Sequence, residues 1–252
     1  MVAVALVTGV TAGAPGPLPL VGAAASVLVY RVVMHRLAGR ETPEIDRRGA
    51  RREFLLGSGL GLGFVLVSAL LITAFGGYSF SWADGDALSL VTSAVIVAGG
   101  AAVAEELMFR GLALQALEQR FGSRVGLVVP ALFFGLSHLA NPGASPWSAL
   151  AIALEAGGLL GAAFLWRRSI WFVVGLHFAW NGAEQLLGIP VSGHPVEGVL
   201  TAKVDGPALL NGGVFGLETS IVPVVIGVLL AVPMLVLARR RGGLVSGRRA
   251  RR

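Results

Sequence analysis

Cysteine is absent from this chain, and charged residues are scarce. The lack of cysteine among 252 residues excludes a disulfide framework, a thiolate zinc site and a thiol nucleophile. Only 13% of the residues are charged, 55% are hydrophobic, and the mean hydropathy is +0.77. A soluble domain of this length carries far more charge, so the composition predicts a polytopic membrane protein.

The hydrophobic runs are long enough for about seven membrane spans, since each span needs roughly 20 apolar residues. The runs lie at Val4–Tyr30, Leu55–Phe75, Leu88–Leu117, Val125–Leu139, Ser148–Trp166, Ile170–Leu187 and Ile221–Leu237. We therefore expect an all-α fold, a polytopic transmembrane helical bundle of about seven to eight spans around a polar intramembrane cavity. Residues 14–17 interrupt the first run and no basic residue precedes it, which favours a broken helix over a cleaved signal peptide.

Arginine is concentrated in every second connection between these runs. The basic connections contain Arg31, Arg36, Arg40, Arg47, Arg48, Arg51 and Arg52, then Arg120 and Arg124, then Arg167 and Arg168, and finally Arg239–Arg241 and the GRRARR tail. Cytoplasmic loops are enriched in Lys and Arg, so the alternation predicts an external N-terminus and a cytoplasmic C-terminus. The net charge of +6 then reflects topology, and we expect the lipid bilayer and not nucleic acid as a partner.

Three ionisable side chains interrupt the third apolar run, in the stretch AVAEELMFRGLAL: Glu105, Glu106 and Arg110. A charge at mid-bilayer costs roughly 2.5 to 3.5 kcal/mol, so each of them needs a partner. Residues four apart share a helical face, which predicts an ion pair between Glu106 and Arg110. Glu105 points about 140° away from Arg110 and requires a partner from another helix.

Two later runs supply such partners. His138 ends FFGLSH in the fourth run, and His177 and Asn181 lie four apart in the sixth. Counting about 1.5 Å per residue places these groups and Glu105 at comparable depths. We expect them to line one intramembrane cavity, although depth does not reveal to which side it opens.

These residue types support two kinds of hydrolytic site. A glutamate and a histidine can deprotonate a water, while a second histidine and an asparagine can stabilise the oxyanion of a tetrahedral intermediate. Alternatively, Glu105, His138 and His177 can supply the three protein ligands of a catalytic zinc. No HExxH motif is present, so the spacing gives zinc no independent support.

The three motifs EExxxR (Glu105–Arg110), FxxxH (Phe134–His138) and HxxxN (His177–Asn181), in this order, resemble the CAAX prenyl protease type 2 family, also called the CPBP or Abi family of intramembrane proteases. The likeness covers about residues 90–187 and includes RGLAL and LLGAAFLWRRSIW. It implies a bundle that usually has eight membrane helices.

The resemblance also implies roles for individual residues. Glu105 would be the general base, His138 would help it hold the water, and His177 and Asn181 would form the oxyanion site. Glu106 and Arg110 would orient these groups. Members of the family have been described both as metalloproteases and as metal-free glutamate proteases, so zinc bound by Glu105, His138 and His177 is implied only for a metal-dependent mechanism.

The resulting prediction is an intramembrane endopeptidase of a prokaryotic plasma membrane, acting on a peptide or protein that is prenylated or membrane-associated. We divide the chain into an N-terminal helix with its basic connection (1–53), a CPBP-like core (54–240) and a basic tail (241–252). The alternative is a non-hydrolytic membrane protein, either a proton or ion relay or a bacteriocin-immunity or scaffold protein, that uses the same buried groups. Two further features are given no catalytic role: Glu155 within the fifth run is expected to line the cavity or to pack between helices, and the glycines of GSGLGLG at residues 57–63 are expected to allow close helix packing.

Overall fold

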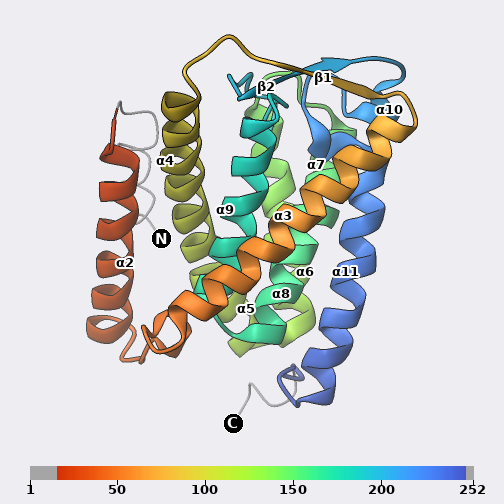
Figure 1. The fold of residues 1–252 in the computed structure, drawn as a ribbon. Helices are drawn as coiled ribbons and strands as arrows, with labels where there is room; N and C mark the ends of the chain where they lie inside the picture. Colours follow the sequence, from red (N-terminus) through yellow and green to blue (C-terminus); the bar gives the residue numbers. More distant parts are fainter. Residues whose placement is uncertain (1–15, 248–252) are drawn as a thin grey trace.

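The computed structural model describes residues 16–247 as a bundle of helices with a two-stranded sheet at one end (Figure 1). The elements, in chain order, are α2 (Leu18–Arg36), η1 (Pro43–Ile45), α3 (Ala50–Ala74), β1 (Tyr78–Trp82), α4 (Ala87–Glu106), η2 (Leu107–Leu114), α5 (Gln115–Phe121), α6 (Ser123–Ser137), η3 (His138–Ala140), α7 (Pro146–Ile152), η4 (Ala153–Gly158), α8 (Leu159–Arg167), α9 (Ile170–Leu186), β2 (Leu200–Val204), α10 (Ala208–Asn211), η5 (Leu217–Thr219) and α11 (Ile221–Arg240). The all-α fold class is confirmed.

Six helical stretches within residues 16–247 are long and apolar enough to cross a membrane: Leu18–Arg36, Ala50–Ala74, Ala87–Phe121, Ser123–Ala140, Pro146–Arg167 and Ile221–Arg240. They correspond to six of the seven expected runs. The remaining run is α9, whose 17 residues are slightly fewer than a full span requires. Because α9 lies among the other helices and most of its side chains are buried, we treat this chain as an integral membrane protein with α9 at its centre (Figure 1).

The structure differs from the sequence expectation at two places. The first span begins at Leu18, directly after Pro17, and continues to Arg36 instead of ending at Tyr30; the part of the expected run at residues 4–15 lies outside the described residues. In addition, β1 and β2 form an antiparallel ribbon that pairs Tyr78 with Val204. Five-residue strands inside long polar connections give no periodic signal long enough to be recognised.

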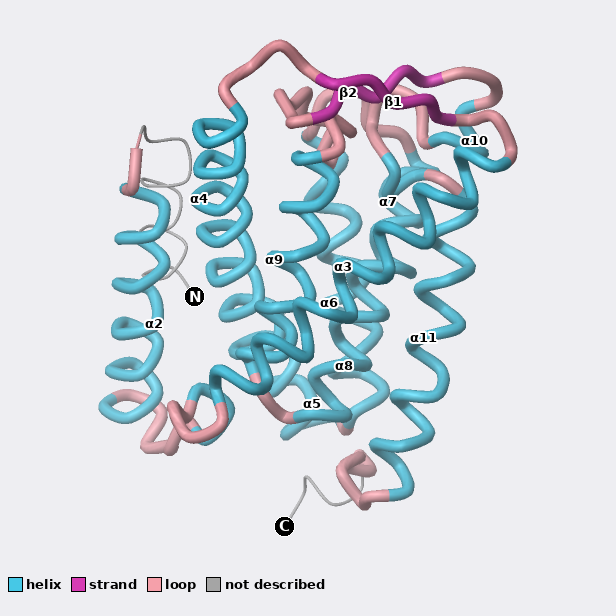
Figure 2. The backbone as a smooth tube through the Cα atoms, in the orientation of Figure 1, coloured by secondary structure: helices cyan, strands magenta, loops and turns pink. Residues whose placement is uncertain are grey.

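The two ends of the bundle differ in their connections (Figure 2). We call one the sheet end; it holds the segments 75–86, 141–145 and 187–220, including both strands. We call the other the basic end; it holds the segments 37–49, 122, 168–169 and 241–247. Polar side chains start several helices at these ends. Asp86, Ser145 and Ser220 each accept a hydrogen bond from a backbone N–H in the first turn of α4, α7 and α11, which satisfies donors that a helix start leaves free.

Helices α3 and α9 cross with their backbones in contact, and glycine makes this possible. A Cβ atom at Gly57 would lie 2.0 Å from the carbonyl oxygen of Phe172, and one at Gly61 would lie 2.2 Å from that of Leu176. Glycines on one helix face allow membrane helices to approach this closely. The packing function expected for GSGLGLG therefore holds for Gly57 and Gly61, while Gly59 and Gly63 face open space.

The contrast between glycines that contact α9 and glycines that face open space allows a matched test of the α3–α9 contact. Gly61→Ala should destabilise the protein by about 1–3 kcal/mol, because the methyl group can fit only if α3 moves away from α9. Gly63→Ala should leave stability unchanged or raise it by about 1 kcal/mol, because alanine favours helix over glycine and nothing obstructs it. Thermal unfolding of both variants in detergent would measure the contrast. Equal midpoints for the two would show that this contact does not hold the helices together.

Candidate active site

A buried ion pair lies at the centre of the site. Arg110 Nη1 donates to Glu106 Oε1 over 2.9 Å, as the spacing of four residues predicted, and both side chains are almost fully buried. The same Glu106 oxygen accepts a hydrogen bond from His177 Nδ1 at 2.8 Å. Glu106 therefore connects α4 to α9. The sequence indicated only its pairing with Arg110, because a contact between distant helices has no signature in local spacing.

Arg110 also connects the two π-helical segments. It lies in η2, and its Nη2 donates to the backbone oxygens of Ala156 at 2.9 Å and Gly157 at 3.3 Å, both in η4. Its guanidinium lies 5.1 Å from the centre of the Phe134 ring, within the range of a cation–π contact. Short π-helical turns occur frequently at functional sites. Here η2, which continues α4, places the Arg110 guanidinium in contact with α6 and with η4, the segment between α7 and α8.

Glu105 points away from this ion pair, as expected, and its side chain remains about one-third exposed. Its Oε2 lies 3.9 Å from His177 Nε2, which is too far for a hydrogen bond. Asn181 Nδ2 lies 3.3 Å from that same nitrogen. Because Glu106 accepts from Nδ1, the His177 ring is oriented so that Nε2 faces Glu105 and Asn181.

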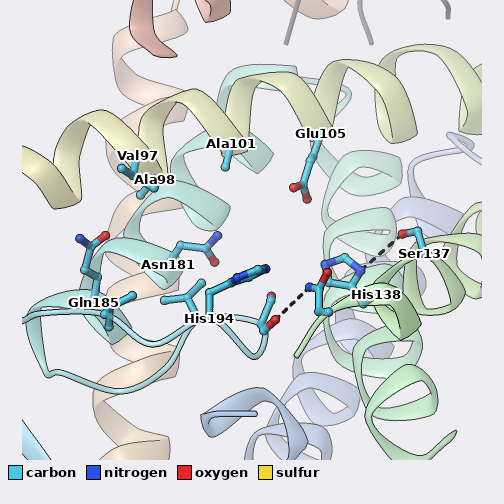
Figure 3. A pocket seen from close by; sticks show the side chains of 13 residues that line it. Val97, Ala98, Ala101, Glu105, Ser137, His138, Asn181, Gln185 and His194 are labelled. Carbon is cyan, nitrogen blue, oxygen red and sulfur yellow. Dashed lines mark hydrogen bonds between the residues drawn. The ribbon is translucent and has the colours of Figure 1, made fainter. Parts of the chain in front are cut away.

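His138 faces the same space from the end of α6. Its Nδ1 lies 2.7 Å from the backbone oxygen of Phe134, and a carbonyl can only accept, so this nitrogen carries the proton. The unprotonated Nε2 is then the acceptor that remains available. Glu105 and His138 extend from different helices into one cavity, with Asn181 on its wall (Figure 3).

The cavity has an outer and an inner part, and both are lined by Glu105, His138 and Asn181. The outer part has a volume of about 440 Å³, which is within the range of ligand-binding pockets. The inner part measures about 20 Å³ and is also lined by His177. About 10–15 Å³ is enough to hold one water molecule. The expected convergence of Glu105, His138, His177 and Asn181 is thus observed.

Three residues of the site were not identified from the sequence. Glu218 in η5 lines the inner cavity and accepts hydrogen bonds from the backbone nitrogen and hydroxyl of Ser192, at 2.7 and 3.0 Å. Ser192 lines both parts, and His194 lines the outer part. All three come from the long connection before α11, where no motif marks them. Glu155 lines neither part; it is buried in η4, with its Cβ facing Gly227 of α11, consistent with a packing position.

A metal ion does not fit these side chains as they are arranged. Within residues 16–247, no group of three His, Asp or Glu side chains lies close enough to hold one. The Nδ1 atoms of His177 and His138 bond to Glu106 and to a backbone carbonyl, so only their Nε2 atoms are left for a ligand. We therefore derive no step through zinc. Zinc dependence stays an alternative, which the chelation experiment described below tests.

Comparison with known families gives a match to part of the chain. A family model described as "Type II CAAX prenyl endopeptidase Rce1-like" matches residues 87–183. This segment of the chain is similar to that family. The resemblance seen in the three motifs is therefore confirmed over this segment, and it implies a protease. A search of curated proteins and a search of solved structures each found no match.

The match contains Glu105, Glu106, Arg110, His138, His177 and Asn181, but it ends before the connection that supplies Ser192, His194 and Glu218. The Rce1-like segment thus covers the helices α4 to α9 that carry the motifs. Chain outside the segment supplies part of the outer wall of the cavity, namely Gln185, Val191, Ser192, His194 and Val196.

The buried pair gives a stability prediction for the Rce1-like segment. Arg110→Met would leave Glu106 without its cation and two backbone oxygens without their donor. Losing one partner of a buried pair costs about 3–5 kcal/mol, so we expect a large fall in the unfolding midpoint in detergent. Arg36→Met, at an exposed arginine at the end of α2, is the control and should change little. The double variant Glu106→Gln/Arg110→Met should recover part of the loss; an Arg110→Met protein as stable as the control would contradict this role.

Proposed function

We propose that this protein is an intramembrane endopeptidase that hydrolyses a peptide bond with a water held between Glu105 and His138. The observation that supports it most is the water-sized inner cavity lined by Glu105, His138, His177 and Asn181. The Rce1-like match to residues 87–183 supports the same class of reaction.

In the proposed mechanism Glu105 acts as the general base. His138 Nε2 accepts one hydrogen of the water, Glu105 takes the other as a proton, and the water oxygen attacks the carbonyl carbon of the scissile bond. The carbonyl oxygen becomes an oxyanion. Glu105 then returns the proton to the departing nitrogen as the C–N bond breaks. The products are a carboxylic acid, which keeps the second hydrogen of the water, and an amine; the acid then passes this proton to the amine or to solvent, and Glu105 is regenerated.

Asn181 and His177 face the position where the oxyanion forms. The Asn181 amide donates to the oxyanion, and so does His177 Nε2 when it carries a proton. Glu106 and Arg110 act through His177: Glu106 fixes the ring through Nδ1, and Arg110 holds Glu106. Both are positioning residues, since neither lines the cavity.

The general-base assignment can be tested with purified protein in detergent and a library of quenched fluorescent peptides. Glu105→Gln should abolish cleavage, because an amide cannot accept the proton. Glu155→Gln is the matched control: it changes a carboxylate that lies within another helix and outside the cavity, and activity should persist. Cleavage by Glu105→Gln at the wild-type rate would refute the base role.

A chelation arm in the same assay addresses zinc. Activity that survives chelation in the wild type and disappears in Glu105→Gln supports a metal-free glutamate mechanism. Loss on chelation that added zinc restores would instead support the metal-dependent alternative. If no form cleaves any peptide of a library that includes prenylated peptides, the relay or scaffold alternative becomes the better account.

The oxyanion assignment predicts a different kinetic effect. Asn181→Ala should lower kcat by about 10² to 10³, the usual effect of losing one oxyanion donor, with little change in KM. Such a change is typical of an interaction made in the transition state only. Steady-state kinetics on a peptide identified in the library would measure both constants. A raised KM with unchanged kcat would place Asn181 in substrate binding instead.

A further inference from the structure

The outer cavity is lined by α4, α6, η3 and α9, and the connections that complete its wall all belong to the sheet end. Asn141 comes from the α6–α7 connection, and Val191, Ser192, His194 and Val196 come from the segment after α9. Asn141 Nδ2 donates to the backbone oxygen of Ser192 over 2.9 Å, which ties the two connections together at the mouth. No lining residue belongs to a connection of the basic end.

Packed side chains close the cavity toward the basic end. On the basic-end side of Glu105, its helical stretch continues through the buried Glu106–Arg110 pair and the inaccessible side chains of Leu107 and Leu114, while the buried Leu160 lines the inner cavity. Glu105 lies 16 residues before the end of this helical stretch at Phe121, or roughly 24 Å at 1.5 Å per residue. The site is thus at mid-depth, with a route to solvent at the sheet end.

Charge distinguishes the two ends just as strongly. The count includes, for each end, its connections and the six adjoining residues of each helix. In the described part of the chain, the sheet end then has one basic residue and six acidic ones: Lys203, with Asp84, Asp86, Glu184, Glu197, Asp205 and Glu218. The basic end has fourteen arginines and five acidic residues: Arg31, Arg36, Arg40, Arg47, Arg48, Arg51, Arg52, Arg120, Arg124, Arg167, Arg168, Arg239, Arg240 and Arg241, with Glu41, Glu44, Asp46, Glu53 and Glu118. Short connections rich in arginine stay in the cytoplasm, so the basic end is the cytoplasmic one.

We infer that the catalytic cavity opens on the non-cytoplasmic face of the membrane. The depth of Glu105 alone does not show to which side of the membrane the cavity opens. That side follows from two observations together: which connections line the cavity, and which end of the bundle carries the arginines. If the proposed function is correct, substrates must present their scissile bond at or within the outer half of the membrane. A C-terminal CAAX peptide confined to the cytoplasm could not reach Glu105, so the substrate class is membrane-anchored or exported polypeptide with an external segment.

The absence of natural cysteine makes the orientation directly testable. We would introduce Glu197→Cys at the sheet end, Glu41→Cys at the basic end as its matched control, and His194→Cys in the cavity wall. Residues 41, 194 and 197 are all exposed in the structure. The full-length variants would be labelled in intact bacterial spheroplasts with a membrane-impermeant maleimide, before and after permeabilisation.

Cysteines at 194 and 197 should label fully in intact spheroplasts, whereas the cysteine at 41 should label only after permeabilisation. The reverse pattern, or equal labelling at both ends in intact spheroplasts, would overturn the inference. Labelling needs no catalysis, so the same pattern is expected in a Glu105→Gln background. If the predicted labelling pattern is found but no peptide is cleaved, the proposed endopeptidase activity is refuted and the orientation stands. If peptides are cleaved but the labelling pattern is reversed, the orientation is refuted and the activity stands.

Discussion

Burial of the Glu106 carboxylate within the membrane is the constraint on which the site depends. A charge at this depth is tolerated only with close partners, and Glu106 has two, Arg110 on its own helix and His177 on α9. Arg110 in turn needs acceptors beyond one carboxylate and obtains them from the backbone of η4. Satisfying one buried charge therefore fixes the relative positions of three helices.

The catalytic groups are by-products of that arrangement. With Nδ1 of His177 bonded to Glu106, its Nε2 faces Asn181 and Glu105. With Nδ1 of His138 bonded to a carbonyl of its own helix, its Nε2 is left as an acceptor. Adjacent glutamates thus lie in different surroundings: Glu106 is enclosed and paired with Arg110, and Glu105 is partly exposed to the cavity, where we propose that it acts as the base. Direct contact of α3 with α9 through glycine holds the helix that carries His177 in place.

The chain outside the Rce1-like segment shapes access to these groups. The connection after α9 places Ser192 and His194 on the wall of the cavity, and Glu218 anchors Ser192 from the start of α11. Such a connection can vary in sequence without moving the helices.

The sequence by itself determined the membrane class, five of the six helical spans to within five residues, the Glu106–Arg110 pair and the six ionisable or amide residues of the three motifs. All of these rest on local properties: apolar length, arginine placement and the spacing of residues four apart on one helix. The tertiary structure alone decided that Glu106 bonds to His177, that Ser192, His194 and Glu218 join the site, and that the cavity faces the sheet end. Those features depend on contacts between segments far apart in the chain, and on the paths of irregular connections, which no local periodicity encodes.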